Sequence, residues 1–266
     1  MRPILTRIFA VACVAALIGG CSSTPEPEDE TRGWTAEKIY SEAKIEQNSN
    51  NYVRSNELFE KLEARFPYGR YAQQAQLEIA YNQYKDAEPA LALAALDRFV
   101  KQNPTHPSLD YAYYLRGLVS FNEAQGFMSQ LAKQDMSERD PKNAKEAFES
   151  FREVAERFPD SKYAQDAHVR MGYLIGALAT HELHVARYYY KRGAFLAAAN
   201  RGKRLLETYG NTKQVEGALG IMVLSYDKLG MTQLRDDAKR ILLKNYPATQ
   251  SMKEDFLSDP WWWAPI

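Results

Sequence analysis

The feature that most constrains the fold of this chain is an internal repeat. Residues 65–75, RFPYGRYAQQA, return as residues 157–167, RFPDSKYAQDA, after a shift of 92 positions. A shorter period of 37 lies inside this one, because Ala43, Ala80 and Gly117 follow one another at that spacing. Periods of about 20–50 residues are typical of proteins built from stacked pairs of helices. The repeat therefore predicts a solenoid of helical pairs.

Each repeat also carries the local signals of a helix that ends at a proline. Leu58, Leu62 and Phe66 fall on one face of a helix, and Pro67 follows directly and cannot continue the hydrogen-bond ladder. A small residue in each unit, such as Gly172 in the fourth, is expected to let the two helices of a pair approach closely. The pattern resembles the tetratricopeptide repeat, with its small residue in the first helix, its aromatic in the second and its terminal proline.

We therefore predict an all-α fold, a tetratricopeptide-repeat solenoid of about five helical pairs over residues 34–250. The third and fourth units exceed the 37-residue period by 18 and 14 residues. We expect the first excess to form a loop near residues 126–143 and the second to lengthen a helix through Tyr188–Tyr190. The five predicted units are residues 35–67, 71–104, 109–159, 161–210 and 212–247.

Residues 1–20 predict a secretory signal peptide. Arg2 and Arg7 give a positive start, an unbroken apolar run of 11 residues follows, and two glycines precede Cys21. The apolar run is shorter than the roughly 20 residues that span a bilayer. Residues 17–21, LIGGC, resemble the lipobox of bacterial lipoproteins, in which the cysteine becomes the acylated first residue of the mature chain.

The residues after the lipobox predict a tether. Lipoproteins kept at the inner membrane usually have aspartate after the cysteine, so Ser22 implies sorting to the outer membrane, with the domain anchored by lipid on its periplasmic face. Residues 21–33 are predicted to be a lipidated, solvated tether, because 22–33 are rich in acidic residues and contain no aliphatic side chain. Twelve extended residues span at most about 40 Å. Cys13 leaves with the signal peptide, so no disulfide is expected.

The charge of the mature chain argues against two kinds of partner. Loss of Arg2 and Arg7 from the 34 basic residues leaves 32 against 34 acidic ones, a net charge of −2. A near-neutral domain lacks the basic surface of a nucleic-acid binder. It also lacks the polybasic segment that holds a helix on a membrane surface. We expect no nucleic acid, and membrane contact through the lipid alone.

No motif in the chain predicts catalysis. Phosphate loops, nucleophile elbows and zinc-protease helices are missing from the sequence. His181 and His184 share a helix face and could bind zinc with a third ligand, but the next histidine, His168, lies 13 residues earlier and would point away. We therefore expect no catalytic residues, no cofactor and no metal, and interpret the pair as ordinary helix surface.

Aromatic and basic residues suggest a peptide-binding groove on the first helices of the early repeats. A concave groove of tyrosines and lysines suits an extended peptide that carries apolar side chains and a carboxylate. The alternative is that the same residues are contacts between repeats. The candidates are Tyr40, Lys44, Tyr81, Tyr84, Lys85 and Tyr114.

Two further segments are candidates for binding partner proteins. Arg187, Tyr188 and Arg192 belong to a basic and aromatic block, and arginine and tyrosine are common interface anchors. The alternative is a solvated helix end. Residues 251–266 form an aromatic tail in which Trp261–Trp263 would expose a large apolar area unless they cover the last repeat or dock onto a partner.

Several segments together resemble one family. The lipobox, the acidic tether, the five repeats, residues 59–80 and 151–172, and the closing stretches 226–231 and 237–240 are similar to the ComL-type BamD lipoproteins of the β-barrel assembly machinery. The resemblance covers nearly the whole mature chain. The tryptophan tail does not match a general pattern of that family.

The resemblance implies a non-catalytic subunit that helps to insert β-barrel proteins into the outer membrane. Its implied partners are the barrel subunit of the machinery, bound through its periplasmic domains mainly by the C-terminal repeats, and smaller lipoprotein subunits. The N-terminal repeats would receive the extended, aromatic-ended C-terminal signal of unfolded outer-membrane protein substrates. Two alternatives remain: an envelope scaffold associated with peptidoglycan or DNA uptake, and an enzyme that uses the histidine pair.

Overall fold

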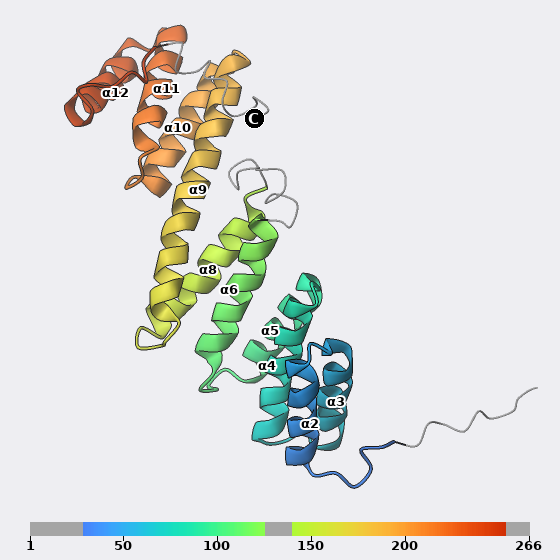
Figure 1. Cartoon of the computed structure of the whole chain (residues 1–266). Helices are drawn as coiled ribbons and strands as arrows, with labels where there is room; N and C mark the ends of the chain where they lie inside the picture. Colours follow the sequence, from blue (N-terminus) through green and yellow to red (C-terminus); the bar gives the residue numbers. More distant parts are fainter. Residues whose placement is uncertain (1–28, 126–139, 254–266) are drawn as a thin grey trace, which may run out of the picture.

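The structure is a computed structural model that describes residues 29–125 and 140–253. Its described part is built from helices stacked in consecutive antiparallel pairs, from α2 and α3 at one end of an elongated molecule to α11 and α12 at the other (Figure 1). The helices are α2 Ala36–Asn48, α3 Tyr52–Arg65, α4 Arg70–Lys85, α5 Pro89–Gln102, α6 Leu109–Gln125, α8 Lys142–Arg157, α9 Ala164–Lys191, α10 Phe195–Tyr209, α11 Val215–Lys228 and α12 Thr232–Asn245. The prediction of an all-α repeat solenoid with five helical pairs is confirmed.

Capping side chains and prolines define where the helices begin and end. The Thr35 side chain accepts a hydrogen bond of 3.2 Å from the Lys38 backbone N–H at the start of α2. Pro89 occupies the first turn of α5, where its missing N–H has no cost. The second helices α3 and α8 each end at an arginine that is followed by Phe-Pro, as at Phe66 and Phe158. The proline stop that the sequence predicts is thus present in both copies.

The two copies of the long repeat place the same aromatic in the core. Phe59 in α3 and Phe151 in α8 are both fully buried. A β-carbon on Gly117 of α6 would lie 2.6 Å from the Phe151 ring, so that glycine does allow α6 and α8 to approach closely. The same prediction is wrong for Gly172 in α9, which is exposed and has open space beside it. Gly172 therefore matches Ala80 in sequence but not in packing, because no described helix packs on that face of α9.

The fourth unit accommodates its extra residues by lengthening its first helix. The helix α9 has 28 residues and continues through Tyr188 to Lys191, as predicted. The corresponding insertion in the third unit falls between α6 and α8, and most of it lies outside the described residues.

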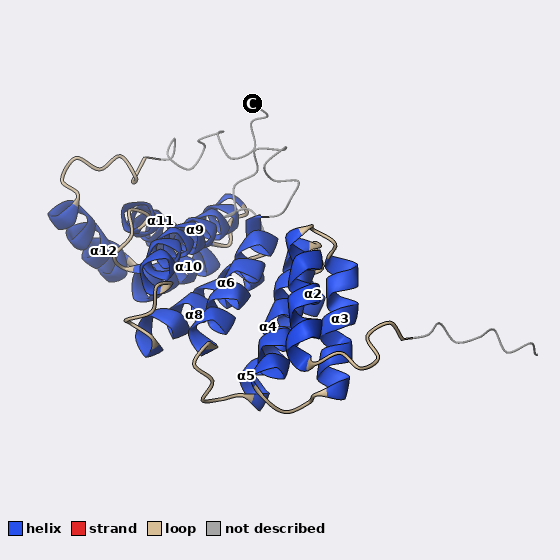
Figure 2. Cartoon of the chain, turned by 60° about the horizontal axis from the view of Figure 1, so that its bottom comes forward, coloured by secondary structure: helices blue, strands red, loops and turns tan. Residues whose placement is uncertain are grey.

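Residues 29–33 are the described part of the predicted tether 21–33, and they pack against the first repeat instead of being solvated; the predicted signal peptide and the rest of the tether lie outside the described residues. Figure 2 shows the loop before α2 passing across α3. The Asp29 carboxylate accepts hydrogen bonds from Lys61 Nζ at 2.9 Å and from Arg65 Nη2 at 2.6 Å. Arg65 also donates to the backbone carbonyl of Thr31, which is fully buried. We call residues 29–33 the N-terminal strap, since two cations of α3 hold the segment against that helix.

A second segment packs over the other end of the solenoid. The backbone carbonyl oxygen of Ser251 lies so close to α11 that a β-carbon on Gly220 would overlap it. Ser251 is buried there, and Met252 packs with the core of the last two helices. Trp261–Trp263 lie outside the described residues. No described helix is long and apolar enough to cross a membrane.

Candidate functional site

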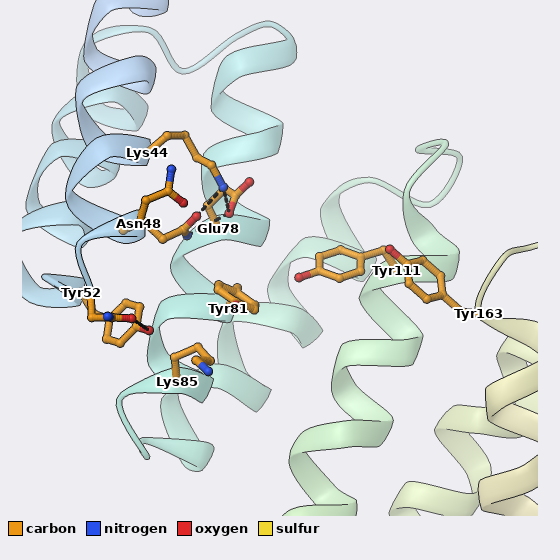
Figure 3. Close-up of a pocket in the computed structure, with 10 residues that line it drawn as sticks. Lys44, Asn48, Tyr52, Glu78, Tyr81, Lys85, Tyr111 and Tyr163 are labelled. Carbon is orange, nitrogen blue, oxygen red and sulfur yellow. Dashed lines mark hydrogen bonds and ion pairs between the residues drawn. The ribbon is translucent and has the colours of Figure 1, made fainter.

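A pocket of about 520 Å³ opens where the first three repeats meet (Figure 3). Its walls come from the end of α2, the turn after it and the start of α3, from the middle and end of α4, from the start of α6 and from the turn before α9. It combines four tyrosines with charged and amide side chains. The lining residues are Lys44, Gln47, Asn48, Asn50, Tyr52, Glu78, Tyr81, Lys85, Tyr111 and Tyr163.

Glu78 accepts three hydrogen bonds in the wall of the pocket. Its Oε2 accepts hydrogen bonds from Lys44 Nζ at 3.0 Å and from Gln47 Nε2 at 2.9 Å. Its Oε1 accepts from the Tyr40 hydroxyl at 3.1 Å. Three donors from α2 therefore converge on one carboxylate of α4. Burial and the nearby charge of Glu78 raise the pKa of the Tyr40 hydroxyl, which keeps it a donor.

A buried polar network fixes the position of α2 against α3 and α4 behind this pocket. Gln47 Nε2 also donates to Asn82 Oδ1 at 2.6 Å, and Asn82 Nδ2 donates to Ser55 Oγ at 2.9 Å. Ser55 in turn donates to the Ala43 carbonyl of α2 at 2.8 Å. Because the buried groups satisfy one another, the network specifies a single alignment of the three helices. That alignment places Lys44 opposite Glu78.

The opposite wall of the pocket is aromatic. Tyr111 extends from α6 toward Tyr81 of α4, and Tyr163 stands behind it (Figure 3). The Tyr111 and Tyr163 ring centroids are 5.7 Å apart. Burial raises the pKa of Tyr111, with smaller contributions from Glu78 and the neighbouring tyrosines, so this ring stays neutral. The wall offers apolar ring faces with hydroxyl groups.

One basic side chain of the pocket has no partner among the described residues. Lys85, at the end of α4, is exposed, and it makes no hydrogen bond or ion pair with any residue the structure describes. Lys44, by contrast, has Glu78 as an ion-pair partner. The site can therefore receive an anionic group at Lys85 and apolar or aromatic groups against the tyrosines.

The structure brings together three of the six residues predicted to form a groove. Lys44, Tyr81 and Lys85 line the pocket. Tyr40 lies behind it, packed between Phe59 and Tyr71 with ring centroids 5.5 Å away in each case.

The other two predicted residues are contacts between repeats, which is the alternative considered for them. Tyr84 accepts a hydrogen bond of 2.7 Å from Asn122 of α6. Tyr114 stacks on Tyr163 with centroids 4.6 Å apart and donates to Asp166 Oδ2 at 2.8 Å. Both side chains are thus committed to helix packing outside the pocket lining.

Sequence reasoning missed Glu78, Tyr111 and Tyr163. Glu78 does carry a signal, because it precedes Tyr81 by three residues and so shares its face of α4. Tyr163 carries none, since it lies in a turn whose position depends on how the third and fourth units pack.

The basic and aromatic block of α9 is split by the fold. Arg187 is only 8% exposed, which argues against its prediction as a partner-binding residue. It lies on the face of α9 that packs into the fourth repeat, beside the buried Ala186. Tyr188 is 52% exposed, and the Arg192 guanidinium lies 5.4 Å from the centre of its ring. Those two residues remain accessible.

The histidine pair lies in the same helix. His181 and His184 are partly buried. No group of three or more histidine, cysteine, aspartate or glutamate side chains suited to a metal ion occurs within residues 29–125 and 140–253.

Comparison with known proteins places the chain in a family. Residues 33–242 match the family described as outer membrane lipoprotein, YfiO. This chain belongs to that family. It is also 52% identical, over 97% of its length and 98% of the relative's, to the outer membrane protein assembly factor BamD of Neisseria meningitidis serogroup B. The BamD protein of Vibrio cholerae is 36% identical over 86% of this chain and 94% of its own length.

The YfiO family membership confirms the predicted outer-membrane localisation of a lipoprotein. Among solved structures, a kinesin light chain with TPR-like repeats from Podosopora anserina covers 80% of this chain and 96% of its own, at 13% identity and a TM-score of 0.37. That similarity is too low to support an argument about function.

Proposed function

We propose that this lipoprotein is a non-catalytic subunit of the outer-membrane β-barrel assembly machinery, and that its first repeats receive the C-terminal segment of an unfolded barrel protein. Family membership and the names of the BamD relatives support the assembly role. The observation that carries the peptide site is the pocket between α2, α4 and α6, where the unpaired Lys85 lies beside aromatic rings.

The chemistry of the pocket matches the end of an extended chain. A terminal carboxylate would pair with the Lys85 ammonium, which has no competing partner among the described side chains. A terminal aromatic ring would pack against Tyr81 and Tyr111, because ring pairs favour offset or edge-to-face contact. A strand presents alternate side chains every two residues, about 6.6 Å apart, so the next apolar group would also face the pocket.

Peptide binding tests this site directly. A synthetic peptide with the last eight residues of an outer-membrane barrel protein, ending in phenylalanine, would be titrated against the mature chain. Lys85→Gln or Tyr81→Ala should each weaken binding by about 1–3 kcal/mol, the range of interface anchors. Lys101→Gln, which removes an exposed charge of α5 outside the pocket, is the matched control. Equal affinity of the parent and both pocket variants, with helicity unchanged, would contradict the assignment.

The last repeats are the proposed contact with the barrel subunit and the smaller lipoproteins. Leu234 and Ile241 of α12 are about half exposed and lie seven residues apart, hence on one helix face. Exposed apolar side chains grouped in this way are typical of protein interfaces. They support a binding surface on α12, and the exposed Tyr188 of α9 is a separate candidate contact in the fourth repeat.

Isolation of the native complex tests the partners. The lipoprotein would be pulled down from detergent-solubilised membranes, and co-purification with a barrel protein and smaller lipoproteins is the expected result. Leu234→Asp with Ile241→Asp should reduce that co-purification while leaving the helical signal intact. Recovery with peptidoglycan fragments or DNA-uptake proteins, without a barrel protein, would favour the alternative of an envelope scaffold of another kind.

A further inference from the structure

The pocket contains a carboxylate of its own, placed where an anionic ligand would otherwise bind. Glu78 lies in the wall of the pocket, and Lys44, Gln47 and Tyr40 all donate to it at 2.9–3.1 Å. An ammonium, an amide N–H and a hydroxyl that converge on two oxygens are a strong receptor for a carboxylate. The protein therefore fills its best anion site with Glu78.

We propose that Glu78 is a built-in competitor that excludes the ligand carboxylate from Lys44 and directs it to Lys85. This inference rests on the proposed peptide site and assigns the residue that sets the position of the peptide end. Glu78 neutralises Lys44, so Lys85 is left as the pocket cation with no partner among the described residues.

The spacing along α4 gives this competition a geometric consequence. Glu78, Tyr81 and Lys85 occupy positions i, i+3 and i+7 of one helix, so they share one face. Seven residues of helix rise about 10 Å, which equals about three residues of an extended peptide. A peptide that ends at Lys85 therefore has its end group clear of Glu78, whereas one that ends at Lys44 would place two carboxylates together. Repulsion between them selects the first arrangement.

A purely structural role for Glu78 is the competing explanation. Its bonds to α2 also join the first repeat to the second, so its loss could loosen the pocket. A loosened pocket would weaken all peptides alike. If Glu78 is a competitor, its removal should instead improve only the binding of peptides with a free carboxylate, because only those peptides compete with Glu78 for Lys44.

The experiment uses the full mature chain and one eight-residue peptide ending in phenylalanine, prepared with a free C-terminal carboxylate and as the C-terminal amide. The variants are Glu78→Gln, which keeps the shape of the side chain, and Glu78→Ala as a second removal of the charge. Glu57→Gln is the control, because it makes the same change in net charge at an exposed glutamate of α3 outside the pocket lining.

Glu78→Gln should tighten binding of the free-acid peptide about two- to fivefold and leave the affinity for the amide peptide unchanged. The gain is small because the Lys44–Glu78 ion pair that it removes is partly exposed and of ordinary strength. Lys85→Gln should abolish the preference for the acid over the amide. Adding Glu78→Gln to Lys85→Gln should restore that preference, because Lys44 becomes available. Adding Lys44→Gln to the double variant should remove it again.

The outcomes separate this inference from the proposed function. If the parent protein binds neither peptide, or binds both equally, the peptide site itself is wrong. If the parent prefers the acid but both Glu78 variants shift acid and amide equally, Glu78 is a structural residue and the inference is refuted. The same conclusion follows if the preference fails to return in the double variant.

Discussion

The close contact between Gly117 and Phe151 predicts how much unfolding free energy is lost when alanine replaces this glycine. In Gly117→Ala the new β-carbon would lie 2.6–2.9 Å from three atoms of the Phe151 ring, where ordinary contacts are 3.4–4 Å. The ring is fully buried and packs against Tyr114 and Phe121, with centroids 6.0 and 6.3 Å away, which leaves it little room to move. Overpacking of this kind costs about 1–3 kcal/mol.

The same substitution also stabilises the helix α6, and this gain offsets part of the overpacking cost. Alanine is favoured over glycine inside a helix by about 1 kcal/mol. The expected loss of unfolding free energy for Gly117→Ala is therefore about 0–2 kcal/mol. Gly172→Ala in α9 is the matched control, because the same gain applies and no atom lies within 4 Å of its new β-carbon. That variant should be more stable than the parent by about 0.5–1 kcal/mol.

Urea titration followed by far-ultraviolet circular dichroism measures both variants. The difference between their midpoints, at equal slope, reports the overpacking alone. Phe151→Leu should relieve it, so Gly117→Ala should cost less in that background than in the parent. If Gly117→Ala stabilises the protein as much as Gly172→Ala does, the tight packing of α6 on α8 is refuted.

Three further predictions follow from individual residues. Cys21→Ser should leave a folded protein that is unprocessed or released from the outer membrane; fractionation measures this, and retention without any partner would contradict it. Burial alone would raise the pKa of Asp166, but hydrogen bonds from Arg170 and Tyr114 outweigh it and lower that pKa. The stabilisation by the Asp166 carboxylate is therefore present above a pH of about 4 and is lost as pH falls through the lower folded pKa. In Asp166→Asn the unfolding free energy should fall less steeply as the solution is acidified. The difference should be less than about 1 kcal/mol, because the site is half exposed. Glu182 is buried and pairs with Arg201 at 3.0 Å and Arg204 at 3.6 Å, so Glu182→Ala should cost about 1–3 kcal/mol in chemical denaturation, whereas Glu149→Ala, at an exposed pair, should cost below about 0.5 kcal/mol.

The parts of the fold that follow from local signals were predictable from the sequence. Phe59 and Phe151 recur at the period of 92 and are both core residues, and Pro67 and Pro159 follow the ends of α3 and α8. The lengthening of α9 was also predictable from the sequence, because inserted residues that favour helix extend the helix in which they lie. Such features depend on residues within one or two turns of each other.

The remaining features depend on contacts between distant residues. Asp29 pairs with Lys61 and Arg65, which lie 32 and 36 positions later in the chain. Composition alone predicts that the acidic segment around Asp29 is solvated. Tyr114 meets Tyr163 only because the third and fourth units pack at one particular angle. Lys44 could be placed on the groove, but its partner Glu78 could not, because the pairing depends on the alignment of α2 with α4.

With a lipid on Cys21, as the lipobox predicts, the N-terminal strap limits how far the first repeat can lie from the membrane. Eight residue steps separate Cys21 from Asp29, so a fully extended chain between them reaches at most about 28 Å. The helix α3, with 14 residues, is itself about 21 Å long. Asp29, and with it the adjoining end of the first repeat, would then lie within a layer little deeper than one of those helices. Such confinement raises the local concentration of the pocket for any chain that emerges at the same membrane, without a single added contact.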